Sequence, residues 1–144
     1  MTKSIRAVLD TNVFVSAALS KNPSSPTREI MERWKNGEFV LLICTPLADE
    51  IVEKLVDHSV DENLIGNLVD RLAKLADWVE VPPEKIEKLL SDPDDNVVVA
   101  CAVEGGANYL VTHDPHFDSL NGEYRNVKIL KAIPFLEILR ETDA

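Results

Sequence analysis

The sequence contains no uninterrupted apolar run long enough to cross a bilayer, which argues against a membrane protein. The first apolar run is broken by Asp10 and Asn12, so it does not have the pattern of a secretory signal. Cysteine is also scarce. Cys44 and Cys101 both lie inside apolar runs and lack metal-type spacing, so we expect them to be reduced and buried. These absences favour a cytoplasmic protein without a membrane segment.

Basic residues are few as well. The 144 residues include 15 lysines and arginines against 25 aspartates and glutamates, which gives a formal net charge of -10. Such a charge repels polyanions at long range and argues against a broad nucleic-acid-binding surface. Any activity on nucleic acid must therefore be local, through bound cations, a groove between subunits or a basic partner.

Two common catalytic arrangements are missing from the sequence. It has no obvious Ser-His or Cys-His pairing, and hence no evident side-chain nucleophile. Of its five glycines only Gly105 and Gly106 are adjacent. They follow an apolar helical segment as a helix stop would, and they do not form a phosphate-binding loop.

What the sequence does contain is an alternation of short apolar runs with helix-like segments. Four runs are predicted to be buried strands: residues 5–9, 39–43, 108–112 and 127–130. Five segments are predicted to be helices: residues 26–36, 46–57, 62–76, 95–104 and 134–141. The alternation predicts an α/β fold with an open parallel sheet covered on both faces. The length fits a single domain over residues 1–144.

Several helical segments carry more specific signals. Thr45 and Pro46 supply an N-cap and a first-turn proline for the second helix. The segment 95–104 is apolar almost all round and should be deeply buried, whereas residues 83–91 resemble a short helix. The segment 62–76 should pack by one face, through a stripe formed by Leu64, Ile65, Leu68, Val69, Leu72 and Leu75.

Four acidic residues interrupt or follow these apolar segments. Asp10 follows the first strand, and Glu50 lies on the first turns of the helix after the second strand. Asp95 opens the buried helix, and Asp114 stands just beyond the strand 108–112. In an open α/β sheet these places share the edge outside the carboxyl ends of the strands, where the connections create a crevice. We therefore expect the four carboxylates to converge.

Most of these acids also have a purely structural explanation. Asp10 is suited to cap a helix, and Asp114 before a proline is good turn chemistry. Asp95, with Asp92 and Asp94, favours a helix N-terminus through capping and the helix dipole. Taken one at a time, these explanations need no active site.

Glu50 is harder to explain structurally, because it lies beside Ile51 on the flank of the apolar stripe and its carboxylate needs a partner. The basic residues Arg6, Lys54 and Lys128 are too scattered to neutralise four acids. Converging carboxylates without cations would repel one another and bind protons, so a hard divalent cation is the most economical neutraliser. Mg²⁺ or Mn²⁺ suits an all-oxygen ligand set.

Four segments together carry a resemblance to a known family. They are Val8-Leu9-Asp10-Thr11-Asn12-Val13, Thr45-Pro46-Leu47-Ala48-Asp49-Glu50-Ile51, Asp92-Pro93-Asp94-Asp95-Asn96 and Tyr109-Leu110-Val111-Thr112-His113-Asp114. In order and spacing they resemble the PIN-domain family, in particular its VapC-like toxin ribonucleases of type II toxin-antitoxin systems. The resemblance implies a three-layer α/β/α sandwich with a central, mostly parallel sheet. It also implies a ribonuclease that depends on Mg²⁺ or Mn²⁺.

The resemblance further implies roles and partners. The acids that it makes metal-binding and catalytic are Asp10, Glu50, Asp95 and Asp114. It gives Asn12 and Thr112 supporting roles in orienting ligands or waters. We assign Asp92 and Asp94 to capping, with contact of one of them to a second metal ion as the alternative. The partners implied are an RNA substrate, a cognate antitoxin protein and a second copy of the chain.

Two other functions stay open from the sequence. A haloacid-dehalogenase-type phosphatase would use Asp10 as its nucleophile, but the second acid expected at position 12 is replaced by Asn12. A non-catalytic binding module would use the acids to hold a structural cation, and it would bind metal without turnover.

The histidines and aromatic residues have simpler interpretations. His113 and His116 flank Asp114 at a spacing that zinc can use, but no cysteine or third histidine lies nearby in the sequence, so we expect surface residues. Structural roles at helix ends or in loop packing are expected for His58, Trp34, Trp78 and Phe117.

Overall fold

The computed structural model describes residues 4–142 and contains a six-stranded sheet in the order β3-β2-β1-β4-β6-β5. The strands are β1 (Arg6–Leu9), β2 (Val40–Ile43), β3 (Asp77–Trp78), β4 (Tyr109–Val111), β5 (Glu123–Tyr124) and β6 (Val127–Leu130). The helices are α1 (Thr11–Leu19), α2 (Pro26–Lys35), α3 (Thr45–Asp57), α4 (Glu62–Leu75), α5 (Pro93–Glu104) and α6 (Ala132–Glu141). Two 3₁₀ turns are η1 (Pro83–Lys85) and η2 (Pro115–Leu120).

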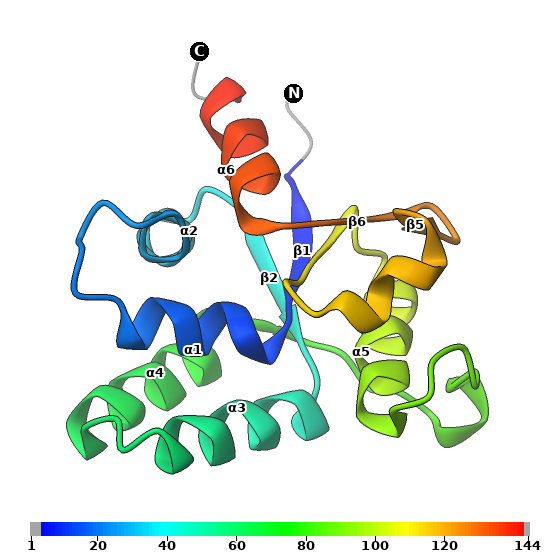
Figure 1. Cartoon of the computed structure of the whole chain (residues 1–144), viewed down its shortest axis with the longest axis horizontal. Helices are drawn as coiled ribbons and strands as arrows, with labels where there is room; N and C mark the ends of the chain where they lie inside the picture. The colour runs from blue at the N-terminus through cyan, green and yellow to red at the C-terminus, as the bar shows by residue number, and fades with distance from the viewer. Residues whose placement is uncertain (1–3, 143–144) are drawn as a thin grey trace.

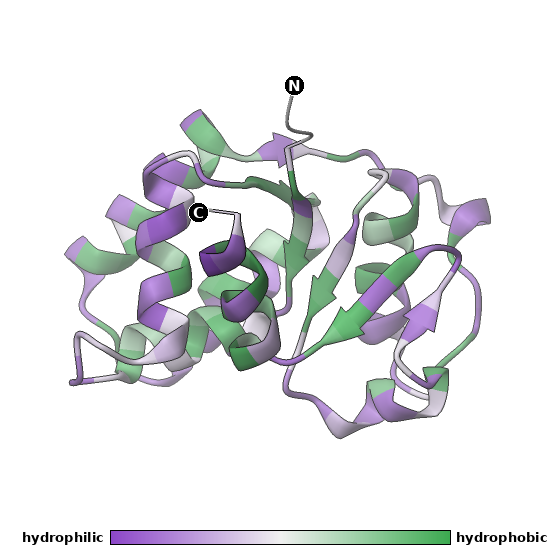
Figure 2. Ribbon diagram, turned by 90° about the horizontal axis from the view of Figure 1, so that it is seen from above, coloured by the Kyte–Doolittle hydropathy of each residue, from purple (hydrophilic) through white to green (hydrophobic). Residues whose placement is uncertain are grey.

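Helices cover both faces of this sheet. Helices α1 to α4 and α6 lie on one side of β1 and β2, and α5 lies on the other, where it contacts β1, β2 and β4 (Figure 1). Figure 2 shows hydrophobic strands enclosed between these helices. The edge strand β5 runs antiparallel to β6, and the other strand pairs are parallel. The predicted α/β/α sandwich with a mostly parallel sheet is confirmed.

The position of β1 decides where a site can form. This strand pairs with β2 on one side and β4 on the other, and Leu9 stands opposite Val111. After β1 the chain turns toward β2 through α1 and α2, whereas β4 is reached only after β3 and α5. The connection that follows β1 and the connection that follows β4 therefore run in opposite directions across the sheet. This opens a crevice at the carboxyl ends of β1 and β4.

The four predicted strands are present, with ends that differ from the prediction by at most one residue. The sequence did not reveal β3 and β5, because two residues each are too short to show alternation. Thr45 is not the N-cap of α3: it is the first helical residue, and Cys44 occupies the cap position without a side-chain cap bond. Cys44 and Cys101 are both buried and free, as expected.

The segment 83–91 is not a helix beyond the 3₁₀ turn η1. Its later amides are bound from outside, because the Asn96 side-chain oxygen accepts hydrogen bonds from the backbone N–H groups of Leu89 and Leu90. The Asn96 amide in turn donates to the Leu90 carbonyl at 2.9 Å. These three bonds fix an irregular strap on α5 just before the acidic segment, which short-range helical spacing cannot anticipate.

Helix α4 packs by one face, as predicted, but with only part of the expected stripe. Leu72 is buried, and Ile65 and Leu68 are partly buried against the core, whereas Leu64, Val69 and Leu75 are exposed. The stripe does not pack as a whole because α4 lies at the periphery and touches the fold chiefly through α3. By contrast, α5 is buried along its length and ends at Gly105, followed by Gly106 with φ of +67°. No helix within residues 4–142 is long and apolar enough to cross a membrane.

Candidate functional site

Asp10 lies at the carboxyl end of β1 and is almost completely buried, with 5% of its surface exposed. It is the N-cap of α1, and its Oδ1 accepts a hydrogen bond from the Thr11 backbone N–H at 2.8 Å. Its Oδ2 accepts a second bond from the Thr112 hydroxyl at 2.7 Å. The capping explanation is thus correct, but it accounts for only one of the two carboxylate oxygens.

The segment after β4 completes this edge of the pocket. Thr112 is buried, and its Oγ1 accepts a hydrogen bond from the Asp114 backbone N–H while donating to Asp10. The Asn12 side-chain oxygen accepts a bond from the His113 backbone N–H at 3.2 Å. Asn12 and Thr112 therefore hold the β4 loop against the start of α1, which is compatible with supporting roles.

Glu50 reaches the same pocket from α3. It lies one turn before Lys54 and two turns before His58, so the three residues follow one ridge of the helix. All three line the pocket that contains Asp10. The half-buried position of Glu50 comes from Ile51 and Leu47, which bury the neighbouring flank of α3 in the core.

Asp92 and Asp95 enter from the opposite layer, at the start of α5. Asp92 is the N-cap of this helix and accepts a bond from the Asp94 backbone N–H, so its predicted capping role is confirmed. It also lines the pocket, together with the buried Asp95. Asp94 is exposed and does not belong to the lining.

These elements enclose a pocket of about 240 Å³. Its lining residues are Asp10, Thr11, Asn12, Val15, Glu50, Lys54, His58, Asp92, Asp95 and Asp114. The four acids singled out in the sequence thus share one pocket, as convergence at the sheet edge requires. Their roles as catalytic and metal-binding groups stay a prediction.

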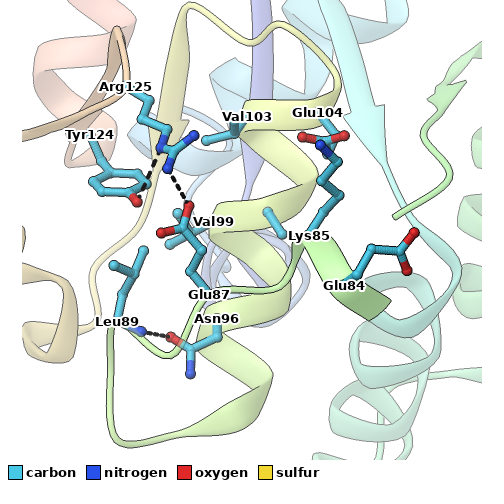
Figure 3. Close-up of a pocket in the computed structure, with 11 residues that line it drawn as sticks. Glu84, Lys85, Glu87, Leu89, Asn96, Val99, Val103, Glu104, Tyr124 and Arg125 are labelled. Atoms are coloured by element: carbon cyan, nitrogen blue, oxygen red, sulfur yellow. Dashed lines mark hydrogen bonds and ion pairs between the residues drawn. The ribbon is translucent and has the colours of Figure 1, made fainter. Parts of the chain in front are cut away.

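A second cavity, of about 280 Å³, lies between α5, the 83–89 strap and the β5 hairpin, and shares no lining residue with the first (Figure 3). There the Arg125 guanidinium lies over the Tyr124 ring and pairs with the Glu87 carboxylate at 2.8 Å. This ion pair neutralises two of the charged groups that line the cavity. We assign it a structural role in holding the strap that leads to Asp92.

The carboxylates perturb one another in the acidic pocket. Burial raises the pKa of Asp10, and repulsion from Asp114 adds to this, although the bond from Thr112 acts in the opposite direction. Burial raises the pKa of Asp95 to about 6. Burial and repulsion from Asp10 raise the pKa of Glu50. The pocket thus carries uncompensated negative charge at neutral pH, a condition that a divalent cation relieves.

His116 does not line the pocket but contacts two of its acids, and sequence reasoning undervalued it. It is exposed, as expected, yet its Nδ1 lies 3.2 Å from Asp95 Oδ2 and 3.3 Å from Asp114 Oδ1. The signal in the sequence was its position two residues after Asp114, in the same loop. His113 has a structural role instead, because its Nε2 accepts a bond from the Ala132 backbone N–H.

The donor set fits a divalent ion. Ligand atoms of Asp92, Asp95 and His116 lie within 4.8 Å of one another. In addition, the Thr11 hydroxyl is buried in the pocket wall without a hydrogen-bond partner among residues 4–142. Because a buried polar atom without a partner costs free energy, this hydroxyl marks a place for a polar ligand such as ion-bound water.

Comparison with known proteins shows the family to which the chain belongs. A family model described as PIN domain matches residues 6–116 of the 144. The chain belongs to the PIN-domain family. The match covers Asp10, Glu50, Asp95 and Asp114, and it disfavours the phosphatase alternative. No curated protein matches the chain significantly.

Two solved structures share the fold of this chain. VapBC2 from Rickettsia felis, solved bound to a DNA fragment from its promoter, superposes with a TM-score of 0.60 and 16% identity, over 88% of this chain and 98% of that chain. VapC20 from Mycobacterium tuberculosis, described as a sarcin-ricin loop cleaving toxin, gives a TM-score of 0.57 and 14% identity, over 85% and 98%. At such identities the likeness concerns the fold.

Proposed function

We propose that this PIN-domain protein is a metal-dependent endoribonuclease that hydrolyses RNA phosphodiester bonds in the cytoplasm, as the toxin of a toxin-antitoxin pair. The observation that carries the proposal is the meeting of Asp10, Glu50, Asp95 and Asp114 in one pocket at the sheet edge. Membership of the PIN-domain family and the likeness of fold to a toxin that cleaves RNA support it.

The residues of the pocket divide the work of hydrolysis. Two hydrogen bonds, from Thr11 and Thr112, hold the Asp10 carboxylate in one orientation toward the pocket. Mg²⁺ or Mn²⁺ held by these acids would supply Lewis-acid activation of water and stabilise charge on the phosphate. Glu50 makes no hydrogen bond to any residue between 4 and 142 and has a raised pKa, which suits it to accept the proton of the attacking water.

Lys54 is suited to bind the substrate. It lines the acidic pocket one turn from Glu50, yet it forms no ion pair with the carboxylates of the described chain. Its ammonium group is therefore available to the RNA phosphate backbone next to the bond that is cleaved. Such a local contact answers the objection raised by the net charge of -10.

The partner proposal comes from the fold and from an exposed apolar surface. The neighbouring structure is that of VapBC2 bound to a DNA fragment from its promoter, and the VapC-like proteins that the sequence resembles are toxins of toxin-antitoxin pairs. In this chain Leu64 is 57% exposed and borders a pocket of about 480 Å³ between α1, α2 and α4. We propose that an antitoxin covers this surface and that the protein forms a homodimer. Size-exclusion chromatography with and without a co-expressed small neighbouring open reading frame would test both.

An RNA cleavage assay tests the enzymatic proposal. Purified protein is incubated with several RNA pools in Mg²⁺ or Mn²⁺, next to Asp10→Asn and the exposed, out-of-pocket control Asp49→Asn. We expect Asp10→Asn to lose about 100-fold or more of the cleavage rate, and Asp49→Asn to retain it. Equal cleavage by wild type and Asp10→Asn would refute the assignment. Metal binding without any turnover would favour the non-catalytic module instead.

A further inference from the structure

The imidazole of His116 lies at the mouth of the acidic pocket and faces carboxylates from two elements. Its Nδ1 is 3.2 Å from Asp95 Oδ2, at the start of α5, and 3.3 Å from Asp114 Oδ1, before η2. A carboxylate oxygen of Asp92 also lies within 4.8 Å of ligand atoms of Asp95 and His116. A nitrogen donor and oxygen donors thus point at a common space.

These separations match what one metal ion requires. Around an octahedral ion with bonds of about 2.1–2.2 Å, neighbouring donor atoms stand about 3 Å apart. The contacts of His116 with Asp95 and Asp114 are within a few tenths of an ångström of that value. The His116 backbone N–H is bound by Asp114 Oδ1 at 2.9 Å, and the adjacent Phe117 is buried, so the loop holds the imidazole in place.

A second feature of the pocket points to a ligand independently of the charged groups. Thr11 lines the same pocket with 6% of its surface exposed, and its buried hydroxyl lacks a partner within the described part of the chain. It is placed to hydrogen-bond a water that an ion carries. The pocket therefore offers a nitrogen donor, oxygen donors and a partner for bound solvent.

We propose that His116 is a direct metal ligand, with Asp92, Asp95 and Asp114, and that its nitrogen makes this site bind Mn²⁺ in preference to Mg²⁺. Imidazole nitrogen is a borderline donor that suits first-row transition ions, whereas Mg²⁺ prefers oxygen ligands and retains its waters. The inference rests on the proposed function only in identifying this ion with the one that the nuclease uses.

Pulsed electron paramagnetic resonance on protein loaded with Mn²⁺ tests the proposal directly, because a bound imidazole produces ¹⁴N modulation of the electron spin echo. We expect this modulation in the tag-free wild type and its loss in His116→Gln, which keeps a polar group at an exposed position. His58→Gln, which removes the histidine that lines the pocket itself, should retain it. Absence of modulation in the wild type, or its persistence in His116→Gln, would overturn the proposal.

Calorimetric titrations with Mn²⁺ and Mg²⁺ give the second readout. In the wild type the dissociation constant for Mg²⁺ should exceed that for Mn²⁺. We expect the ratio of the Mg²⁺ constant to the Mn²⁺ constant to fall about tenfold in His116→Gln. An unchanged ratio would count against a nitrogen ligand. Cleavage assays on the same samples separate the two proposals. If nitrogen coordinates the ion but neither Mn²⁺ nor Mg²⁺ supports cleavage, only the proposed nuclease function is refuted. If RNA is cleaved without nitrogen coordination, only the proposal for His116 is refuted.

Discussion

Replacing Asp95 by asparagine should stabilise the metal-free protein at neutral pH, because the site concentrates negative charge that folding must accommodate. Burial is the main reason that the pKa of Asp95 stands at about 6 in place of 3.8, and repulsion from Asp114 adds to it. A difference of about two pKa units corresponds to about 3 kcal/mol lost from folding stability when the group is ionised. Asp95→Asn removes that ionisation.

A smaller effect opposes the gain. Asp95 lies in the first turn of α5, where a negative charge stabilises the helix dipole by about 0.5–1 kcal/mol. The hydrogen bond between Asp95 and His116 needs no separate correction, because it lowers the pKa of Asp95 and is already contained in the value of about 6. The net gain expected above pH 7 is therefore about 2 kcal/mol, equivalent to a Tm about 6 °C higher for a chain of this length.

The difference in stability between Asp95→Asn and wild type should depend on pH. A carboxyl with a raised folded-state pKa contributes stability that is fully present below its unfolded pKa and is lost as the pH rises through the folded pKa. The difference between Asp95→Asn and wild type should thus be small at pH 4.5 and largest above pH 7. Glu29 does not mask this trend. Its pKa is lowered from 4.5 to about 2, so the stability that it contributes to the protein is lost only as the pH falls through that acidic range.

Thermal melts in chelator, from pH 4.5 to 8, measure this effect, with the exposed Asp49→Asn as the control. Adding Mn²⁺ should stabilise the wild type more than Asp95→Asn and so close the gap. A midpoint for Asp95→Asn that is equal to or below that of wild type at pH 7.5 in chelator would refute the crowded acidic pocket.

Three further predictions concern other parts of the molecule. Thr112→Val removes the hydroxyl that bonds Asp10 and the Asp114 amide, so we expect metal affinity and cleavage to fall about 10–100-fold with little change in shape; unchanged metal titrations would contradict this. Lys54→Gln should reduce the salt dependence of RNA binding by about one unit of slope, measured on the inactive Asp10→Asn background, whereas the distant Lys74→Gln should not. Gly66→Ala on α4, where an added methyl meets open space, should raise stability by about 1 kcal/mol in urea melts. Gly105→Ala, whose methyl would stand 2.8 Å from Val79, should lower it by about 1–3 kcal/mol, and equal effects would contradict the packing of α5.

Much of the fold follows from local pattern. The runs that became β1, β2 and β4 are largely buried, so their apolar character is nearly continuous and visible without coordinates. The run that became β6 is also mostly apolar, although its Lys128 is exposed. The helical spacing of α3 and the apolar surface of α5 are equally local. Pattern fails where contacts with remote residues decide, as in the two-residue strand β3, the strap bound by Asn96 and the unpacked side of α4.

For the site, the sequence alone determined which acids follow which strands, and the geometry of parallel sheets then directs those acids to one edge. Only the tertiary structure decided the rest. It showed that Asp92 both caps α5 and lines the pocket, that the Thr112 hydroxyl fixes Asp10, and that His116 faces Asp95 and Asp114. The physical reason is that hydrogen bonds and ligand donors act over about 3 Å, and such separations between residues 21 to 102 positions apart exist only once the strands and helices have packed.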